Sequence, residues 1–429
     1  MELLLFTSYY PYEFGDTFFI KPEIPFLSRV FDKIHIINID REGVKHKKVD
    51  VPSNLYTVPT EIFMSKFRSK YKKAHSLFSF FFHPFRLTYI LFFELCILLK
   101  HKNLNFSTFK TAISYLLNAN LLALTIKQYL LHNPKIKLIY TYWFKCETLA
   151  SLICKQFYNS PVKCITRTHG GDLFEFVQKN NYQPYKKWMD NYIDRIFFAS
   201  KAGYDYYLNL FAGKHKFKYI ISRLGNINPY KFQENNYLNY SNTNLNIVSC
   251  SYMIPIKRIH LIINAISEIN DIIINWVHIG NGVESDNLNN LANNLLYNKT
   301  NISYNFIGFL TNDSIKKYYY ENYFDCFIST TASEGGNPVS MMEAISFGIP
   351  VIASNVGGVP EIVNEETGML LNPDNCVKEL AKALHQFSAM TVLEKETLRK
   401  SCRIFWEENY NADTQYPLFI DNINNLLLE

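Results

Sequence analysis

The sequence predicts an α/β protein made of two Rossmann-like domains, each built on a parallel β-sheet. The chain has 429 residues, more than a single hydrophobic core usually serves, and 48% of them are hydrophobic, enough for two cores. In the second half, short apolar runs alternate regularly with amphipathic helical patterns. Strand, helix and strand repeated in this order give parallel strands joined by right-handed crossovers.

The first half carries the same signal less regularly, with longer pieces between the strands. Its predicted strands are 2–8, 33–39, 137–143, 163–169 and 195–200. In the second half the predicted strands are 245–252, 275–280, 304–310, 324–331 and 350–354, and the helices between them include 257–269, 284–296 and 313–323.

A polar, Asn-rich segment at 228–244 has no sustained apolar period and is typical of a linker. We therefore predict a first domain over 1–230 and a second over 244–405. The last segment, 406–429, ends in a helical pattern that can pack on either domain, including a return to the first.

The charge balance, the cysteine pattern and the N-terminus limit the classes of function that the protein can have. The 44 basic and 38 acidic residues leave a charge of +6, which suits an anionic ligand or a membrane surface but does not indicate a nucleic-acid binder. None of the eight cysteines forms a C-x-x-C pair, which favours reduced thiols over a zinc site or disulfide framework. Glu2 stands where an export signal needs positive charge, so we expect a cytoplasmic protein.

The stretch SEGGNPVSMMEAISFGIP, residues 333–350, predicts a helix over 338–347 with an anion site at its start. Asn337 is a suitable N-cap, Pro338 suits the first helical position, and Gly348 ends the helix. In an open α/β sheet this helix start lies outside the carboxyl ends of the strands, where ligands bind. Its free N–H groups and positive dipole end would accept a diphosphate.

Two carboxylates, Glu334 and Glu343, flank that anion site and can accept hydrogen bonds from sugar hydroxyls. In the alternative interpretation, Ser340 and Glu343 form a capping box and Glu334 is solvated. Pro338 argues against the box, because the cap then belongs to Asn337.

At these residues the sequence resembles glycosyltransferase family 4, whose signature is Glu-x7-Glu. Here Glu334 and Glu343 enclose eight residues, and the extra one falls within Gly335-Gly336-Asn337, where a glycine is easily added. The resemblance implies that Glu334 approaches the donor sugar and acts in catalysis, while Glu343 binds the ribose. It also assigns the segment between them to the donor site: Gly335, Gly336, Asn337, Pro338, Val339 and Ser340.

The resemblance covers most of the chain and is strongest over 245–375. It implies the GT-B fold, in which two Rossmann-like domains face each other across a crevice. The first domain would bind the acceptor and the second a nucleotide-sugar donor.

His169 follows a predicted strand, and Gly170 and Gly171 allow close backbone approach there. The resemblance implies that His169 is catalytic and contacts the donor sugar near the reacting carbon. Asp172 is expected to orient this loop. The alternative is a structural histidine, the commoner role of an isolated one.

Lys257 and Arg258 are predicted to open a helix after the first strand of the second domain. The resemblance places a basic pair on the donor diphosphate, with Lys257 catalytic. The family usually has an arginine earlier in the loop, where this chain has Ser251-Tyr252, so Arg258 is expected to supply that charge. Two cations at a helix start oppose its dipole, which disfavours a purely structural role.

Two glycine-containing turns carry weaker signals. Gly15 and Asp16 follow the first strand and are candidates for contact with donor or acceptor. Gly280 and Gly282 begin a dinucleotide-binding pattern, but Ser285 occupies the place of its third glycine.

The segment 62–100 has no acidic residue between Ile62 and Phe93, and five cations precede its aromatic run. Arg86 and other polar residues interrupt that run, which favours an interfacial segment over a transmembrane helix. Clustered cations beside aromatic residues attract anionic headgroups. A buried core helix with a solvated charged face explains the pattern equally well.

The expected function is a retaining hexosyltransferase that moves a sugar from a nucleotide-diphosphate donor to a glycan or lipid-linked glycan. No Asp-x-Asp occurs, so we expect no metal ion or other cofactor. The resemblance implies that a donor phosphate oxygen takes the acceptor proton, in capsule or O-antigen assembly at the inner face of the cytoplasmic membrane. The alternatives are a nucleotide-sugar epimerase of the same fold and a catalytically inactive sugar-nucleotide binding protein.

Overall fold

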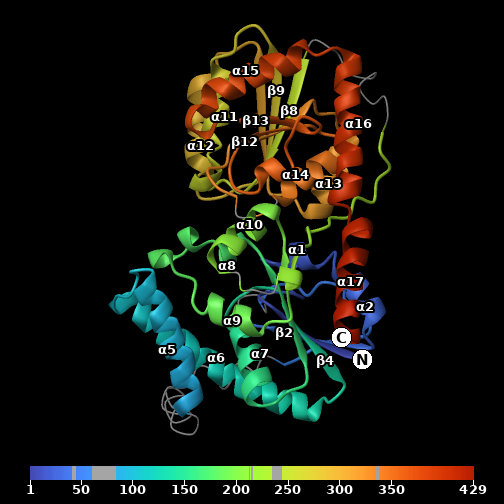
Figure 1. Ribbon diagram of the computed structural model, residues 1–429. Helices are drawn as coiled ribbons and strands as arrows, with labels where there is room; N and C mark the ends of the chain where they lie inside the picture. Colours follow the sequence, from blue (N-terminus) through green and yellow to red (C-terminus); the bar gives the residue numbers. More distant parts are fainter. Residues whose placement is uncertain are drawn as a thin grey trace. The chain divides into compact units, whose positions relative to one another are not determined.

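The computed structural model describes residues 1–40, 45–59, 84–211, 213, 216–233, 244–334, 336 and 338–429. The chain divides into two compact units. Unit 1 comprises 1–223 and 416–429, and unit 2 comprises 224–415 (Figure 1). Each unit is a parallel sheet with helices on both faces, which confirms the predicted α/β class.

Unit 1 contains a seven-stranded parallel sheet in the order β3-β2-β1-β4-β5-β6-β7. Its strands are β1 Glu2–Thr7, β2 Lys33–Asn38, β3 Leu55–Thr57, β4 Ile136–Thr141, β5 Lys163–Thr168, β6 Arg195–Phe198 and β7 Tyr219–Ile221. In the register, Leu5 of β1 lies opposite Ile36 of β2 and Tyr140 of β4. The strand order reverses between β1 and β4, so the loops after these strands border a topological switch point.

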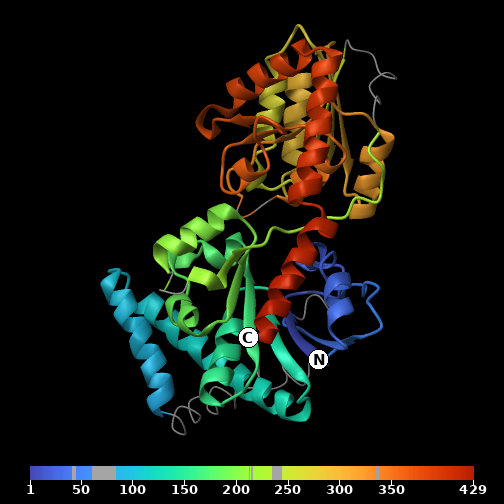
Figure 2. The same cartoon turned by 45° about the vertical axis from the view of Figure 1, so that its right-hand side comes forward.

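Helices cover both faces of this sheet (Figures 1 and 2). One face carries α5 Pro84–Lys100, α6 Phe106–His132, α7 Cys146–Phe157 and α9 Lys186–Tyr192. The other carries α1 Thr17–Ile20, α2 Ile24–Val30 and the last turns of α17 Ala412–Leu428. Phe419 of α17 packs 5.6 Å from Tyr140, centroid to centroid, and Tyr416 packs 5.3 Å from Phe26.

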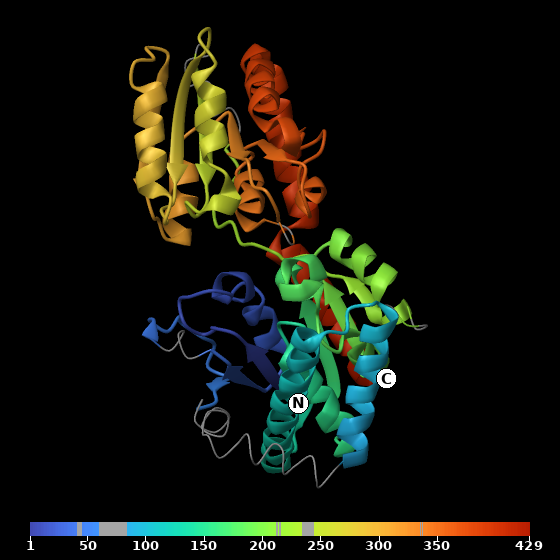
Figure 3. The same cartoon turned by 90° about the vertical axis from the view of Figure 1, so that its left-hand side faces the viewer.

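Shorter elements complete unit 1. They are α8 Gly170–Leu173, α10 Lys201–Leu210, η2 Glu175–Val177, η3 Lys179–Asn181 and η4 Lys216–Lys218. Among the described helices, α6 is long and apolar enough to cross a membrane by length and composition. It lies beside α5 (Figure 3) and packs on α7, with Ala112, Leu116 and Ala119 in the core. These contacts are those of a core helix.

Unit 2 contains a six-stranded parallel sheet in the order β10-β9-β8-β11-β12-β13. Its strands are β8 Asn244–Cys250, β9 Ile273–Ile279, β10 Ile302–Gly308, β11 Cys326–Ser329, β12 Val351–Ser354 and β13 Gly368–Leu371. One face carries α11 His260–Ser267, α12 Ser285–Leu296 and α15 Cys376–Ala389, and the other carries α13 Asn312–Glu321, α14 Val339–Ser346 and α16 Val392–Asn409 (Figure 1). The short turns are η6 Pro255–Lys257, η7 Val359–Glu361 and η8 Pro373–Asn375.

The unit boundary precedes the predicted linker. Residues 224–233 belong to unit 2, where Tyr230 stacks on Tyr320 with centroids 4.4 Å apart. The rest of the linker, 234–243, lies outside the described residues. The terminal segment also divides, because unit 1 includes 416–429 and unit 2 ends at Gln415. The expected crevice between the two sheets stays a prediction.

Candidate functional site

In unit 2 the strand order reverses between β8 and β11, and the loops after these strands are joined by hydrogen bonds. The Thr330 hydroxyl donates to the Arg258 carbonyl oxygen at 2.9 Å, and the Ala332 N–H donates to the Ile256 oxygen at 2.8 Å. Ligands bind at such switch points in open α/β sheets. This pair of loops is therefore the candidate site of unit 2.

Lys257 and Glu334 form an ion pair at this point, one residue from each loop. Their side chains are 24% and 16% exposed, so both are partly desolvated yet reachable. The Glu334 backbone is held closely by Gly357, which has φ +53°. A Cβ on Gly357 would lie 1.7 Å from the Glu334 carbonyl oxygen. Two residues predicted as catalytic are thus brought together, with Glu334 on a constrained loop.

Arg258 connects the same two loops through hydrogen bonds. Its guanidinium donates to the carbonyl oxygens of Thr330 and Thr331, at 2.8 and 3.0 Å, and to the Ser354 hydroxyl at 3.4 Å. The residue is left-handed, with φ +48°, and follows the turn η6. The prediction that Lys257 and Arg258 open a helix is therefore wrong. The helix α11 starts only at His260, because the left-handed residue interrupts the backbone pattern.

The start of α14 also differs from the prediction. Pro338 has ψ 119° and is the N-cap, so the first helical residue is Val339. The carbonyl oxygen of Pro338 accepts the N–H groups of Met341 and Met342, which closes the first turn one residue later than expected. No side chain caps this helix start. Of the predicted loop, Gly335 and Asn337 lie outside the described residues.

The backbone at Gly336, ahead of α14, faces open space. A Cβ built on Gly336 would meet no atom within 4 Å, so protein packing does not require a glycine there. Val339 and Ser340 are partly exposed at the helix start. The N–H groups of a first helical turn have no partner within their own helix, and the helix dipole favours an anion beside them.

Glu343 lies in the second turn of α14 and is buried, with 4% of its surface exposed. Its carboxylate accepts a hydrogen bond from the Asn312 amide at the start of α13. Burial raises the pKa of the Glu343 carboxyl, while the Asn312 hydrogen bond acts in the opposite direction. The alternative capping box with Ser340 is not formed, since the carboxylate is turned to α13.

The Gly280 and Gly282 pair has a packing reason. A Cβ on Gly280 would lie 2.0 Å from the Ser251 carbonyl oxygen, and one on Gly282 would lie 2.4 Å from the Met253 carbonyl oxygen. The two glycines therefore let the loop after β9 pass against the loop after β8. This accounts for the partial glycine pattern without a dinucleotide.

In unit 1, His169 follows β5 and lies against two aromatic rings. Its ring centroid is 4.9 Å from Tyr142 and 4.5 Å from Trp143. Its buried Nε2 has no hydrogen-bond partner among the described residues. Burial, with a smaller contribution from the Arg167 cation, lowers the pKa of His169 to about 3. The ring is therefore neutral near pH 7 and suits hydrogen bonding better than proton transfer.

Asp172 holds the turn that carries His169. Its carboxylate accepts the N–H of His169 and the N–H of Phe144, both at 2.6 Å. The side chain is fully buried, and burial raises the pKa of its carboxyl. These bonds tie the turn after β5 to the loop after β4.

Gly15 and Asp16 have contacts within their own loop. The Asp16 carboxylate accepts the N–H groups of Ser8 and Tyr9 and the indole N–H of Trp143, each at 2.8 Å. Gly15 has φ +54°, and a Cβ there would lie 2.1 Å from the Tyr9 ring. Contact with a donor or acceptor stays a prediction for both residues.

Two contributors to these sites were not found from the sequence, Trp143 and Asn312. Trp143 ends a predicted strand next to the switch point of unit 1, which is a usable signal. Asn312 carries no local pattern that singles it out. Within the described ranges no three His, Cys, Asp or Glu side chains gather as in a metal site, and the eight cysteines are free thiols.

Comparison with known proteins finds similarity to one family over part of the chain. Residues 244–389 match the model of the family described as Glycosyl transferases group 1. The chain is 32% identical over 108 residues to the sulfoquinovosyl transferase SQD2 of Arabidopsis thaliana, covering 24% of this chain and 21% of the relative. It is 34% identical over 85 residues to the amylovoran biosynthesis glycosyltransferase AmsK of Erwinia amylovora, covering 19% and 21%. The chain thus spans about a fifth of the length of these relatives.

Solved structures match over the whole chain. Anabaena HepE in complex with UDP gives a TM-score of 0.66 at 14% identity, covering 99% of both chains. The lipopolysaccharide outer core galactosyltransferase WaaB in its apo form gives 0.63 at 12% identity, covering 100% of this chain and 99% of the other. At such identities the likeness is one of fold.

Proposed function

We propose that the chain is a group 1 glycosyl transferase, which transfers a sugar from a nucleotide-diphosphate donor to a glycan. The match of residues 244–389 to that family and the GT-B fold shared with solved structures support this. The observation that carries the proposal is the Lys257–Glu334 ion pair at the switch point of unit 2, close in sequence to the start of α14. A cation, a sugar-binding carboxylate and a helix N-terminus are what a diphosphate-linked sugar requires.

In the proposed reaction the bond between the anomeric carbon and the diphosphate breaks, and an acceptor oxygen bonds to that carbon with retention. The acceptor proton goes to an oxygen of the departing diphosphate. Lys257 and the N–H groups of α14 stabilise the charge that grows on the leaving group. Glu334 accepts hydrogen bonds from the sugar hydroxyls, and no metal ion takes part.

Two further residues have supporting roles. Glu343 is proposed to hold the ribose, with Asn312 fixing the direction of its carboxylate. His169 is proposed to act as a neutral hydrogen-bonding group, because with a pKa of about 3 its ring is unprotonated near pH 7. Arg258 is proposed to shape the diphosphate site, since three of its hydrogen bonds go to neighbouring protein groups.

Calorimetric titration with UDP and GDP tests the donor site. We expect one of the two to bind, with UDP tried first because Anabaena HepE was solved with UDP. The Glu343→Gln and Lys257→Ala variants should each weaken binding. Lys378→Ala, an exposed lysine on α15, is the matched control and should bind as the wild type does. If neither nucleotide binds, the donor site is absent and the proposal fails.

Product analysis then separates the transferase from its two rivals. A transferase releases free nucleotide in an acceptor-dependent way. An epimerase converts the donor without any acceptor. An inactive binding protein leaves the donor unchanged although it binds the nucleotide. We propose a cell-surface polysaccharide as the acceptor class, in capsule or O-antigen assembly. Among the similar proteins, AmsK is a glycosyltransferase of amylovoran biosynthesis and WaaB is a lipopolysaccharide outer core galactosyltransferase.

We further propose that the acceptor is lipid-linked and that unit 1 contacts the inner face of the cytoplasmic membrane. Of the segment 62–100, residues 62–83 lie outside the described part of the chain. In α5, Leu87 and Ile90 are buried, whereas Phe85 and Phe92 are 88% and 65% exposed. This outer face is largely apolar, although Arg86 and Thr88 are exposed on it too. A core helix with a solvated charged face would expose fewer aromatic residues.

Flotation with vesicles containing anionic lipid tests membrane contact. The wild type should float with the vesicles, less so at high salt, because the basic residues of the segment contribute electrostatic attraction. The double change of Phe85→Ser and Phe92→Ser should reduce flotation. Leu131→Ser, which alters an exposed leucine at the far end of α6, is the control and should float normally. Wild-type protein that stays with the unbound fraction would remove the membrane from the proposal.

A further inference from the structure

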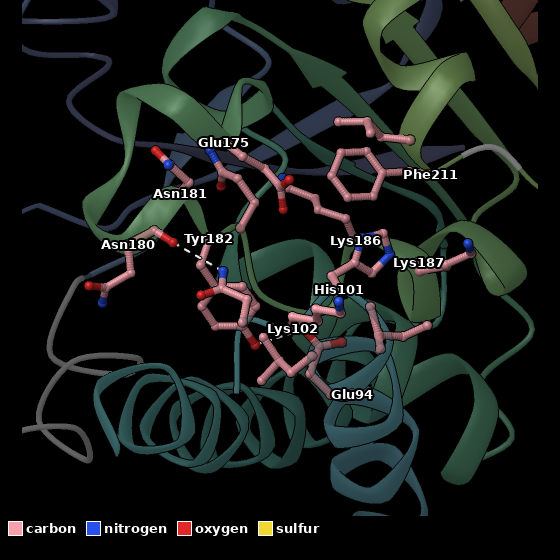
Figure 4. A pocket seen from close by; sticks show the side chains of 15 residues that line it. Glu94, His101, Lys102, Glu175, Asn180, Asn181, Tyr182, Lys186, Lys187 and Phe211 are labelled. Atoms are coloured by element: carbon pink, nitrogen blue, oxygen red, sulfur yellow. Dashed lines mark hydrogen bonds between the residues drawn. The ribbon is translucent and has the colours of Figure 1, made fainter. Parts of the chain in front are cut away.

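Unit 1 contains a pocket of about 390 Å³ that none of the roles above uses (Figure 4). The end of α5, the segment η2 to η3, the start of α9 and the end of α10 line it. Its volume lies within the range of about 300–1,000 Å³ found for small-ligand pockets. It has room for a monosaccharide or disaccharide unit.

Two ionisable side chains of the pocket wall are buried. Glu94 of α5 accepts the Tyr182 hydroxyl at 2.7 Å and the Tyr185 N–H at 2.9 Å. Lys186 of α9 donates to the Phe144 carbonyl oxygen and lies 3.9 Å from the centre of the Phe144 ring. Burial raises the pKa of Glu94 to about 7 and lowers that of Lys186 to about 7. Buried ionisable groups with strongly shifted pKa values are more common at functional sites than elsewhere in proteins.

The pocket lining also contains two lysines whose charge no ion pair matches. Lys102 and Lys187 line the pocket (Figure 4), and within the described residues neither side chain forms an ion pair or a hydrogen bond. The other carboxylate in the wall, Glu175, is engaged, since the Gln183 backbone donates a hydrogen bond to it. The lining therefore offers free cations to an anionic group and amide groups, such as Asn181, to hydroxyls.

Several residues in or beside the pocket lining have an uncommon backbone conformation. Lys102, Asn180 and Asn181, all in the lining, have positive φ angles of 55°, 62° and 48°. Tyr185, beside the pocket, has φ 62°. Asparagine adopts this region readily, but lysine and tyrosine do so at a cost. Conformations of this kind gather at ligand-binding sites.

The pocket wall is joined to the turn of His169. Lys186 donates to the carbonyl of Phe144, whose N–H donates to Asp172, and Asp172 also accepts the His169 N–H. The Gln183 amide donates to the Gly171 carbonyl oxygen at 3.3 Å. A ligand in the pocket would therefore share a continuous set of hydrogen bonds with this turn.

We propose that the pocket binds an acidic sugar, one that carries a carboxylate or a phosphate, with its acid group on Lys102 and Lys187 and its hydroxyls on the amide and carboxyl groups of the wall. In naming that sugar as a unit of the acceptor glycan, the proposal rests on the proposed function. The pocket would hold the acceptor chain at a unit other than the one that receives the new sugar.

The test is a set of calorimetric or ligand-observed NMR titrations of the full chain with four probes: glucuronic acid, glucose 6-phosphate, glucose and inorganic phosphate. At least one acidic sugar should bind about tenfold or more tightly than glucose and than inorganic phosphate, because a charge-assisted bond adds to the sugar contacts. Preference between the two acidic probes identifies the acid. Equal binding of glucose, or of phosphate alone, would overturn the proposal.

Variants locate the site. Lys102→Ala combined with Lys187→Ala should weaken the acidic probe about tenfold or more. Lys179→Ala, an exposed lysine of η3 outside the lining, should bind it normally. A thermal melt checks that the double variant folds. Titration of the wild type with UDP and GDP keeps the two proposals apart. Binding of either nucleotide without acidic-sugar binding rejects the pocket alone, and acidic-sugar binding with neither nucleotide bound rejects the donor site alone.

Discussion

At the scale of single residues, the ion pair of Lys257 and Glu334 is both partly buried and accessible to a ligand. Each charge is partly desolvated, so each needs a partner, yet both remain reachable for a ligand. The ammonium group has three donors, and one bond to Glu334 leaves others for a diphosphate. Pairing thus keeps the cation in position before the donor arrives.

Lys257→Ala should lower kcat/KM by about 10²–10³, the cost of losing one preorganised donor at developing negative charge. The Lys257→Arg variant keeps the charge with a different geometry and should recover part of the loss. Rates are measured as acceptor-dependent release of nucleotide, with Lys378→Ala as the control. Full turnover by Lys257→Ala would remove this lysine from the mechanism.

Glu94 gives a prediction about pH. Its pKa is raised from 4.5 to about 7 in the folded protein, chiefly by burial, so the folded state holds the proton more strongly than the unfolded state does. The stability linked to this proton is fully present below pH 4.5 and is lost as pH rises through about 7. The loss approaches about 3 kcal/mol for a shift of this size.

The variant Glu94→Gln stays neutral and should escape that loss. Its melting temperature minus that of the wild type, measured in matched buffers from pH 4 to pH 8, should increase across this range. Because both proteins share every other titrating group, the difference isolates Glu94. A difference that is constant with pH would show that this carboxyl titrates normally.

At the scale of elements, the loop between β11 and α14 shows two uses of glycine. Gly357 packs against this loop: because it has no Cβ, the Glu334 backbone can lie close to it. Its φ of +53° is also left-handed. Gly336 has no neighbour that a Cβ would touch. The first glycine is required by the fold, whereas the second leaves the backbone open to a ligand.

Alanine at the two positions should therefore have opposite signatures. Gly357→Ala should lower the melting temperature, because a Cβ would overlap the Glu334 carbonyl. Gly336→Ala should melt with the wild type but bind the donor nucleotide more weakly. Calorimetry and thermal melting of both variants check the pair. Normal donor affinity in Gly336→Ala would mean that the ligand does not approach this backbone.

Element prediction from the sequence succeeded where apolar runs are long and failed where elements are short. All ten predicted strands are present, because buried strands of a parallel sheet are nearly continuous apolar runs. The strands β3, β7 and β13 were missed, since they have three or four residues each and lie at or beside sheet edges. The helix start at Pro338 was displaced by one residue, within the usual uncertainty of helix ends.

At the scale of the whole molecule, side-chain partners were the part that the sequence could not supply. The order of strands places Lys257 and Glu334 at one switch point, and that much follows from topology. The engagement of Asp16 by Trp143, and the pocket lined by Glu94 and Lys102, depend on contacts between segments far apart in the chain. No local pattern encodes such contacts.

The chain passes between the units twice, after Arg223 and after Gln415, and this makes the units unequal. Unit 2 is one continuous segment, 224–415, and should fold alone with a cooperative melt.

Unit 1 needs residues 416–429, whose Tyr416 and Phe419 are almost fully buried against its sheet. A fragment of residues 1–223 would expose that apolar surface, so it should aggregate or melt well below the full chain, and a peptide of residues 412–429 should stabilise it. In the intact protein, Phe419→Ala should cost about 3–5 kcal/mol, whereas the neighbouring exposed Leu418→Ala should cost little. If the 1–223 fragment were as stable as the full chain, the terminal helix would be an accessory and not a part of the core of unit 1.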